Sequence, residues 1–140
     1  MSNILVPVDG SEHSERAVEY AVNHFPDGDI TALHVVELPE GYFSAFMEDL
    51  EDLPQVEDEK AEAREILDTI RATAEELGAT IDTAYVTGKP SNQILTYAEE
   101  NDIDEIVIGN RGLSGVGRVM FGSVAEQVVR RSEIPVVVVH

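Results

Sequence analysis

Two kinds of hydrophobic pattern alternate along the whole chain. Short and nearly continuous apolar runs, typical of buried strands, are separated by segments whose apolar residues recur every three or four positions, as in amphipathic helices. The pattern predicts strands over 4–8, 30–36, 80–86, 103–108 and 134–139. It predicts helices that start near residue 11, span about 57–77, start near residue 90 and span 123–131.

Residues that favour helix ends support these boundaries. Ser11 can cap the first helix, because a serine side chain accepts a hydrogen bond from a backbone N–H of the first turn. Pro90 suits the first turn of the third helix, and Gly78 stands where the second helix would end. Ser123 and Glu126 form the S-x-x-E capping box of the fourth helix. Each predicted helix therefore has a local start or stop signal.

The alternation of strands and helices indicates the fold class. The order β-α-β-α-β-α-β-α-β is typical of an α/β domain with an open parallel sheet, right-handed crossovers and helices on both faces. Strands that are apolar throughout fit burial on both faces. With 140 residues, we expect a single domain that spans 1–140. Ligands of such sheets bind beyond the carboxyl ends of the strands, where the strand order reverses.

The segment 37–59 has no periodic pattern. It contains two prolines, many acidic residues and a group of large apolar side chains: Tyr42, Phe43, Phe46 and Met47. A loop this long in a compact domain is usually functional or has no fixed structure. Two interpretations stay open, an irregular surface excursion and a lid or partner-docking segment.

The charge of the chain narrows the choice of partners. Aspartate and glutamate total 28 against 9 lysines and arginines, which gives a net charge of −19. Such a surface repels nucleic acids and anionic membranes, and its composition resembles that of proteins from a high-salt cytoplasm. The chain has no cysteine, which excludes disulfides and thiolate chemistry. We expect a cytoplasmic protein, because the sequence has neither a secretory leader pattern nor an apolar run of about 18 residues.

Five glycines within fourteen residues, from Gly109 to Gly122, separate the fourth strand from the fourth helix. A helix N-terminus presents unpaired N–H groups and a partial positive charge, and a glycine-rich approach lets further N–H groups face an anion. Arg111 and Arg118 add positive charge to this loop. The loop lacks the lysine of the P-loop, and Met120 breaks the dinucleotide fingerprint G-x-G-x-x-G. The sequence therefore predicts a phosphate site that neither motif describes.

The spacing of Gly109, Gly112, Gly122 and Ser123, G-x-x-G-x9-G-S, resembles the ATP-binding branch of the universal stress protein family. The segments ILVPVDGS near the N-terminus, LHVV in the second strand and IPVVVV at the end match this family in the same order along the whole chain. The resemblance implies a five-stranded parallel sheet of order 3-2-1-4-5 with four helices, the adenine nucleotide alpha hydrolase-like fold. It also implies a stress-response regulator that binds ATP with Mg²⁺ or Mn²⁺ and forms a homodimer.

The last predicted strand, from Ile134 to Val139, offers a surface for dimerisation. We expect it at an edge of the sheet, where unpaired backbone groups can pair with another strand. The strand is apolar and uncharged in an acidic protein, which favours pairing with a second copy. Shielding of this edge by the chain itself is the alternative. The family resemblance implies antiparallel pairing of this strand in the homodimer.

The resemblance also implies a set of cofactor-binding positions. Asp9 would lie near the ribose and near a metal coordinated mainly by the phosphates, and Val35 would offer backbone hydrogen bonds to adenine. The complete set is Pro7, Asp9, Val35, Ile108, Gly109, Arg111, Gly112, Gly122, Ser123, Val124 and Ala125. Ala125 stands where the family often has a hydroxyl residue, so one side-chain contact with phosphate would be missing. Asn110, between two motif residues, is expected to change little.

Simpler interpretations of the same residues stay open. Asp9 could serve only the start of the first helix, and Ser123 could be only a helix cap. The four histidines have no metal-ligand spacing, and His34 is expected to be a hydrogen-bonded core residue. Asp9 is the only candidate base near the phosphate loop, so we expect ATP hydrolysis to be slow or absent. The alternatives to nucleotide-dependent regulation are a slow ATPase in the same cleft and an interaction module without nucleotide.

Overall fold

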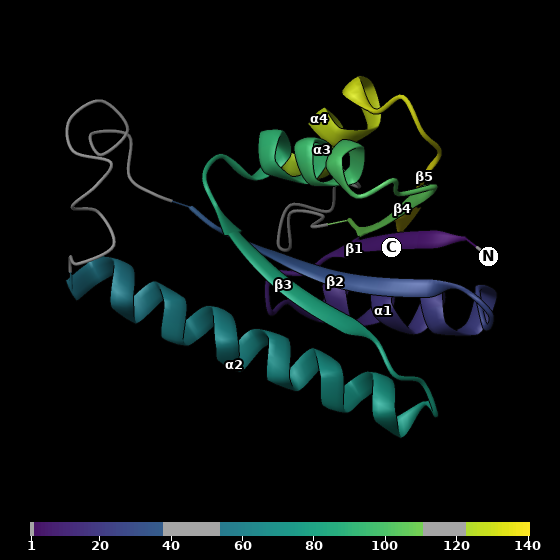
Figure 1. Cartoon of the computed structure of the whole chain (residues 1–140), viewed down its shortest axis with the longest axis horizontal. Helices are drawn as coiled ribbons and strands as arrows, with labels where there is room; N and C mark the ends of the chain where they lie inside the picture. Colours follow the sequence, from purple (N-terminus) through teal and green to yellow (C-terminus); the bar gives the residue numbers. More distant parts are fainter. Residues whose placement is uncertain (1, 38–53, 111–122) are drawn as a thin grey trace.

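Strands and helices alternate in the computed structural model, which describes residues 2–37, 54–110 and 123–140 (Figure 1). The strands are β1 (Asn3–Pro7), β2 (Asp29–Val36), β3 (Asp82–Thr87), β4 (Glu105–Gly109) and β5 (Val136–Val139). The helices are α1 (Glu12–His24), α2 (Pro54–Glu76), α3 (Pro90–Glu100) and α4 (Ser123–Arg131). Their order along the chain is the one that the hydrophobic pattern predicts.

The five strands form one parallel sheet in the order β3-β2-β1-β4-β5. This confirms both the predicted fold class and the predicted order. β1 is the central strand, with Pro7 opposite Leu33 of β2 on one side and Leu5 opposite Ile106 of β4 on the other. The strand order reverses between β1 and β4, so the crossovers that leave these two strands run to opposite sides.

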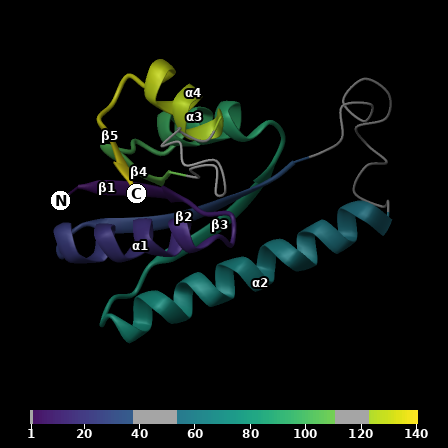
Figure 2. The ribbon, with the colours of Figure 1, turned by 180° about the vertical axis from the view of Figure 1, so that it is seen from behind.

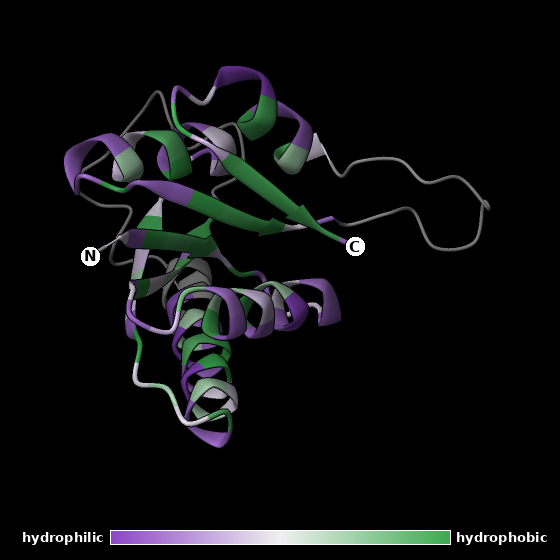
Figure 3. Ribbon diagram, turned by 90° about the vertical axis from the view of Figure 1, so that its right-hand side faces the viewer, coloured by the Kyte–Doolittle hydropathy of each residue, from purple (hydrophilic) through white to green (hydrophobic). Residues whose placement is uncertain are grey.

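Helices cover both faces of the sheet, as the two opposite views in Figures 1 and 2 show. α1 and α2 lie on one face, and α3 and α4 lie on the other. Figure 3 shows the apolar strands between helices of mixed hydropathy. Among the helices that the structure describes, none is both long enough and apolar enough to cross a membrane.

The buried apolar side chains form a core on each face of the sheet. One cluster, under α1 and α2, includes Ile4, Val18 and Ile70, and the other, under α3 and α4, includes Leu5 and Ile94. None of these five side chains is more than 2% exposed. Successive residues of a strand point to opposite faces, which is why the neighbours in β1 belong to different clusters.

The ends of α1 and α2 follow the predicted capping signals. Ser11 has extended backbone angles, φ −80° and ψ 161°, and its side chain accepts a hydrogen bond from the first turn of α1. After α2, the N–H of Gly78 donates to Glu75 and the N–H of Ala79 donates to Ala74, at 3.0 and 2.9 Å. This is the Schellman arrangement. Gly78 has a φ of +82°, which glycine adopts without steric cost.

Several element boundaries differ from the predictions. α2 begins at Pro54, so the irregular segment is shorter than 37–59; the missing N–H of proline costs nothing in the first turn of a helix. Ile103, predicted to start the fourth strand, instead closes the turn after α3, because its N–H donates to the carbonyl of Ala98 at 3.0 Å. β5 begins at Val136, two residues later than predicted.

Candidate functional site

The carboxyl ends of β1 and β4 lie side by side where the strand order reverses. β1 ends at Pro7, which is buried, and β4 ends at Gly109. The register, with Leu5 opposite Ile106, places Val8 opposite Gly109 when it is continued past β1. The predicted site positions at the ends of these two strands are therefore brought together.

Asp9 lies in the turn that leads from β1 into α1. Its Oδ1 accepts a hydrogen bond from the N–H of Ser11 at 2.9 Å, and its own N–H donates to the Ser14 hydroxyl at 3.4 Å. Asp9 is partly buried, and the next residue, Gly10, has a φ of +84°. Asp9 thus shapes the start of α1, as the simpler interpretation holds, and it does so beside the end of β1.

A cleft of about 320 Å³ opens next to this turn, between α1 and α2. Four acidic residues line it, Asp9, Glu15, Glu62 and Glu65, together with apolar and small side chains from α2 and the turn. Carboxylates repel anions, so this cleft is a poor place for phosphate groups.

His34 in β2 contacts the end of β1. Its Nδ1 lies 2.8 Å from the carbonyl oxygen of Val8. Because a carbonyl oxygen can only accept, Nδ1 carries the proton in this contact. His34 and Val35 are both partly buried, so His34 is hydrogen-bonded as predicted but lies at the border of the core. Val35, the predicted adenine position, is thereby next to the end of β1.

Gly109 has a structural reason to be glycine. A Cβ at this position would lie 2.5 Å from the carbonyl oxygen of His13 and 2.7 Å from its carbonyl carbon. Both are backbone atoms of α1, which cannot rotate away as the end of a side chain could. Gly109 therefore allows α1 to pack closely against β4. The preceding Ile108 is 5% exposed and packs in the core, so only its backbone could border a ligand.

α4 starts on the side of the sheet where β4 ends, because β4 and β5 are parallel and α4 lies in the connection between them. Ser123, its first residue, is exposed, and Val124 is partly buried. Ala125 is 3% exposed and packs in the core, so its side chain is not available to a ligand. The first N–H groups of a helix have no partner within the helix, which suits this end to anions.

The predicted capping box of α4 is not what the structure shows. The Glu126 carboxylate lies 2.8 Å from the Arg130 guanidinium, one turn later in the helix. α4 begins at Ser123 itself, so this serine is within the first turn and does not precede it. The simpler interpretation of Ser123, a cap that Glu126 completes, therefore has no support.

Asn110 has a larger structural role than the sequence indicates. It is 3% exposed, its N–H donates to the carbonyl of Val139 at 2.7 Å, and its Nδ2 lies 3.0 Å from Nδ1 of His140. These contacts tie the residue after β4 to the end of β5. The available sequence signal was a polar residue directly after a buried strand, next to the glycine motif.

Three predicted site residues, Arg111, Gly112 and Gly122, lie outside the described residues, as does most of the segment 37–59. Within the ranges that the structure describes, no group of three or more His, Cys, Asp or Glu side chains is arranged to hold a metal ion.

Comparison with known proteins identifies the family. The universal stress protein family matches residues 1–140. The chain is 36% identical to universal stress protein MJ0531 of Methanocaldococcus jannaschii, over 97% of this chain and 80% of that protein. The solved structure of universal stress protein UspA from Lactobacillus plantarum has a TM-score of 0.77 at 32% identity, and the match covers 99% of this chain and 97% of that one. A universal stress protein solved in complex with cAMP has a TM-score of 0.69 at 27% identity, over 99% and 95% of the two chains. The chain belongs to the universal stress protein family.

Proposed function

We propose that this universal stress protein binds ATP at the carboxyl ends of β1 and β4, with Mg²⁺ or Mn²⁺ held mainly by the phosphates. Nucleotide occupancy would alter which partner the protein docks with, in a homodimer formed through β5. One observation carries the proposal. The carboxyl ends of β1 and β4 and the first turn of α4 lie at the same end of the sheet, where the strand order reverses. The relative solved with cAMP supports an adenine nucleotide as the ligand class.

The first turn of α4 would bind the phosphates. A helix N-terminus contributes about 0.3–1 kcal/mol toward an anion, and each hydrogen bond to a charged group contributes about 1.5–3 kcal/mol. The backbone N–H groups of Ser123, Val124 and Ala125 would act here, with Arg111, Gly112 and Gly122 as further proposed contacts. The net charge of −19 does not prevent this, because exposed charges more than about 8 Å away are largely screened.

Asp9 and Val35 would hold the adenosine side of the nucleotide. The carboxylate of Asp9 would approach the ribose and the metal, since carboxylate oxygens are ligands that Mg²⁺ prefers. Val35 would offer its backbone to the adenine edge. The bound cation would neutralise part of the phosphate charge, and most of its ligands would come from the phosphates.

β5 would form the dimer interface. It is the last strand in the sheet order, paired with β4 on one side, and each of its four valines is partly exposed. An apolar edge strand leaves backbone groups unpaired, and a second copy of the same strand would satisfy them. Val137 faces the cluster under α1 and Val138 faces the opposite one, so the strand is held firmly on both faces.

Substitution of Ser123 tests the role of α4 without removing the helix. Proline suits the first position of a helix, so Ser123→Pro keeps α4 and removes one N–H donor together with the hydroxyl group. Ser123→Ala is the matched control, because it removes only the hydroxyl group. Isothermal titration calorimetry with Mg-ATP gives Kd for both variants. A lost hydrogen bond of about 1.5–3 kcal/mol predicts binding about 10- to 160-fold weaker for Ser123→Pro, and a much smaller loss for Ser123→Ala.

Two outcomes would contradict the proposal in different ways. If Ser123→Pro is folded by circular dichroism and binds Mg-ATP as tightly as the unaltered protein, the phosphates do not lie at the first turn of α4. If the unaltered protein gives no heat with ATP, AMP or cAMP, it does not bind adenine nucleotides.

A further inference from the structure

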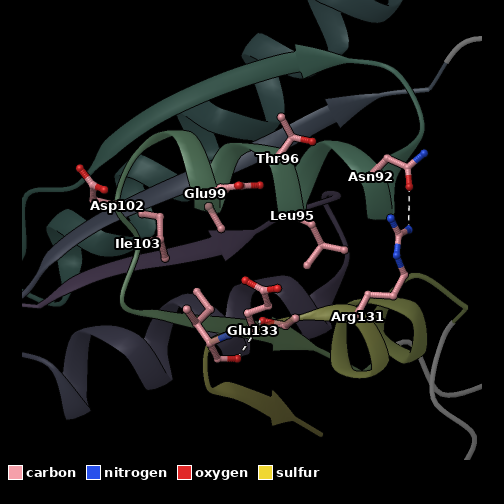
Figure 4. A pocket seen from close by; sticks show the side chains of 11 residues that line it. Asn92, Leu95, Thr96, Glu99, Asp102, Ile103, Arg131 and Glu133 are labelled. Atoms are coloured by element: carbon pink, nitrogen blue, oxygen red, sulfur yellow. Dashed lines mark hydrogen bonds between the residues drawn. The ribbon is translucent and has the colours of Figure 1, made fainter.

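A groove of about 720 Å³ runs between α3 and the connection from α4 to β5 (Figure 4). It lies on the face of the sheet that α3 and α4 cover. Among the predicted nucleotide-site residues that the structure describes, none lines it. The groove is therefore distinct from the described part of the predicted nucleotide site.

Four apolar side chains lie at the floor of the groove, and the rest of its exposed lining is mostly polar. Ala98 is 7% exposed and Ile103 is 8% exposed. Leu95 and Ile134 are partly buried and pack against the same core cluster. Figure 4 shows Leu95 on α3 pointing into the groove. Such a floor can cover aliphatic side chains of a partner, because removing apolar surface from water is favourable.

The rim at one end of the groove is acidic. Glu99, Asp102 and Glu133 line it, and all three are exposed. Glu99 comes from α3 and Glu133 from the α4–β5 connection, on opposite sides of the groove (Figure 4). In the part of the chain that the structure describes, none of the three carboxylates has an ion-pair partner.

The dipole of α3 makes the electrostatic potential at this rim more negative. Glu99 lies in the last turn of α3, which contains no basic residue, and Asp102 comes two residues after the end of that helix. The C-terminal end of a helix carries a partial negative charge, so these carboxylates add to it and do not offset it. A cation at the rim would relieve this concentration of like charge.

The basic side chain in the lining is engaged at the other end of the groove. Arg131 donates from Nη1 to Oδ1 of Asn92 at 2.6 Å, as the dashed line in Figure 4 shows. Three carboxylates against this one guanidinium give the described lining a net charge of −2. The groove thus combines an apolar floor with an excess of negative charge.

We propose that this groove docks a segment of another protein in which aliphatic and basic side chains alternate. The aliphatic side chains would lie on the floor, and the basic ones would reach the rim formed by Glu99, Asp102 and Glu133. α3, which forms one wall, has 11 residues, and a rise of about 1.5 Å per residue makes it about 16 Å long. This length fits about five residues of extended chain, at about 3.3 Å each.

The composition of the chain argues against a second copy as the occupant. It has only 9 lysines and arginines against 28 acidic residues, so two copies would bring like charges together at this rim. A segment from a different protein, with lysine or arginine at alternate positions, complements the groove in both charge and hydropathy.

NMR titration of the full ¹⁵N-labelled chain tests the proposal. The probe is an acetylated and amidated hexapeptide of alternating leucine and arginine, added at about 0.1 M salt, where the Debye length is about 10 Å. We expect saturable shifts of the amides of Leu95, Ile103 and Ile134. A hexapeptide of alternating serine and arginine should bind about tenfold more weakly or worse, because it cannot use the apolar floor.

A charge-matched pair of variants separates the groove from the charge of the whole protein. The groove variant removes three negative charges through Glu99→Gln, Asp102→Asn and Glu133→Gln. Asparagine is chosen at residue 102 because it tolerates the φ of +52° there. We expect this variant to bind the leucine–arginine peptide about tenfold more weakly or worse.

The control variant removes the same number of charges from the other face of the sheet. It carries Glu15→Gln, Glu62→Gln and Glu65→Gln, and all three of these glutamates line the cleft between α1 and α2. We expect it to change peptide affinity by less than about twofold.

Three results would overturn the proposal. Equal weakening by the two triple variants would show that the whole-protein charge attracts the peptide. Shifts centred away from the groove, or no binding, would exclude this docking surface. Equal affinity for the serine–arginine peptide or for spermidine, with the same shifts, would show a site for small polycations in place of a protein segment.

Discussion

Replacing Gly109 by alanine should destabilise the fold through one close backbone approach. The new Cβ would lie 2.5 Å from the carbonyl oxygen of His13, about 0.9 Å short of the 3.4 Å at which ordinary van der Waals contact begins. The opposing atoms belong to the backbone of α1, so the helix itself would have to shift. Overpacking of a core costs about 1–3 kcal/mol, and a rigid opposing backbone places this variant at about 2–3 kcal/mol. For a domain of this size, that lowers Tm by about 5–10 °C.

Urea unfolding measures the effect, with a lower midpoint and an unchanged m value expected for Gly109→Ala. Gly78→Ala is the control, because residue 78 has a φ of +82° and no atom within 4 Å of an added Cβ. Its cost comes from backbone conformation alone and should be about 1–2 kcal/mol. If Gly109→Ala costs no more than Gly78→Ala, the packing explanation is wrong. Loss of ATP binding without loss of stability would mean that this glycine serves the ligand.

Two further substitutions test other parts of the account. Asp102 has a φ of +52°, so Asp102→Gly should raise the free energy of unfolding by about 1 kcal/mol in urea titration; an unchanged midpoint would show that the left-handed conformation at this residue carries no strain. Val137→Glu places a charge on the edge strand and should shift the proposed homodimer toward monomer in light scattering, on protein that circular dichroism shows to be folded. An intact dimer would place the interface elsewhere.

The fold class could be predicted because the apolar residues of each helix and strand show how many of its faces are buried. Strands covered on both faces are apolar throughout, and helices covered on one face repeat every three or four residues, so element type can be inferred locally. The exact first and last residues of the helices and strands could not be predicted. Ile103 is apolar and buried like a strand residue, yet its N–H bonds back to α3, because hydropathy reports burial and not the hydrogen-bond partner. The strand order came from the family resemblance, since periodicity does not fix which strands are neighbours.

The site was predictable only in part, because it depends on residues far apart in the sequence. The glycine at 109 was expected to serve a ligand, but its need for a bare Cα arises from His13, on another element. The sequence indicates only a minor role for Asn110, but its side chain contacts His140, the residue directly after β5. The acidic rim likewise joins Glu99 to Glu133 through the packing of α3 beside the α4–β5 connection. Patterns of neighbouring residues in the sequence do not show such contacts between distant residues.

Titration of Mg-ATP into the ¹⁵N-labelled chain, followed by NMR, tests most directly whether the nucleotide lies where β1, β4 and α4 meet. If the nucleotide lies there, the amide signals of Asp9, Val35 and Ser123 shift saturably, while those of Glu99 and Glu133 in the groove beside α3 do not shift. Shifts confined to the groove, or no shifts at millimolar Mg-ATP, would contradict this placement.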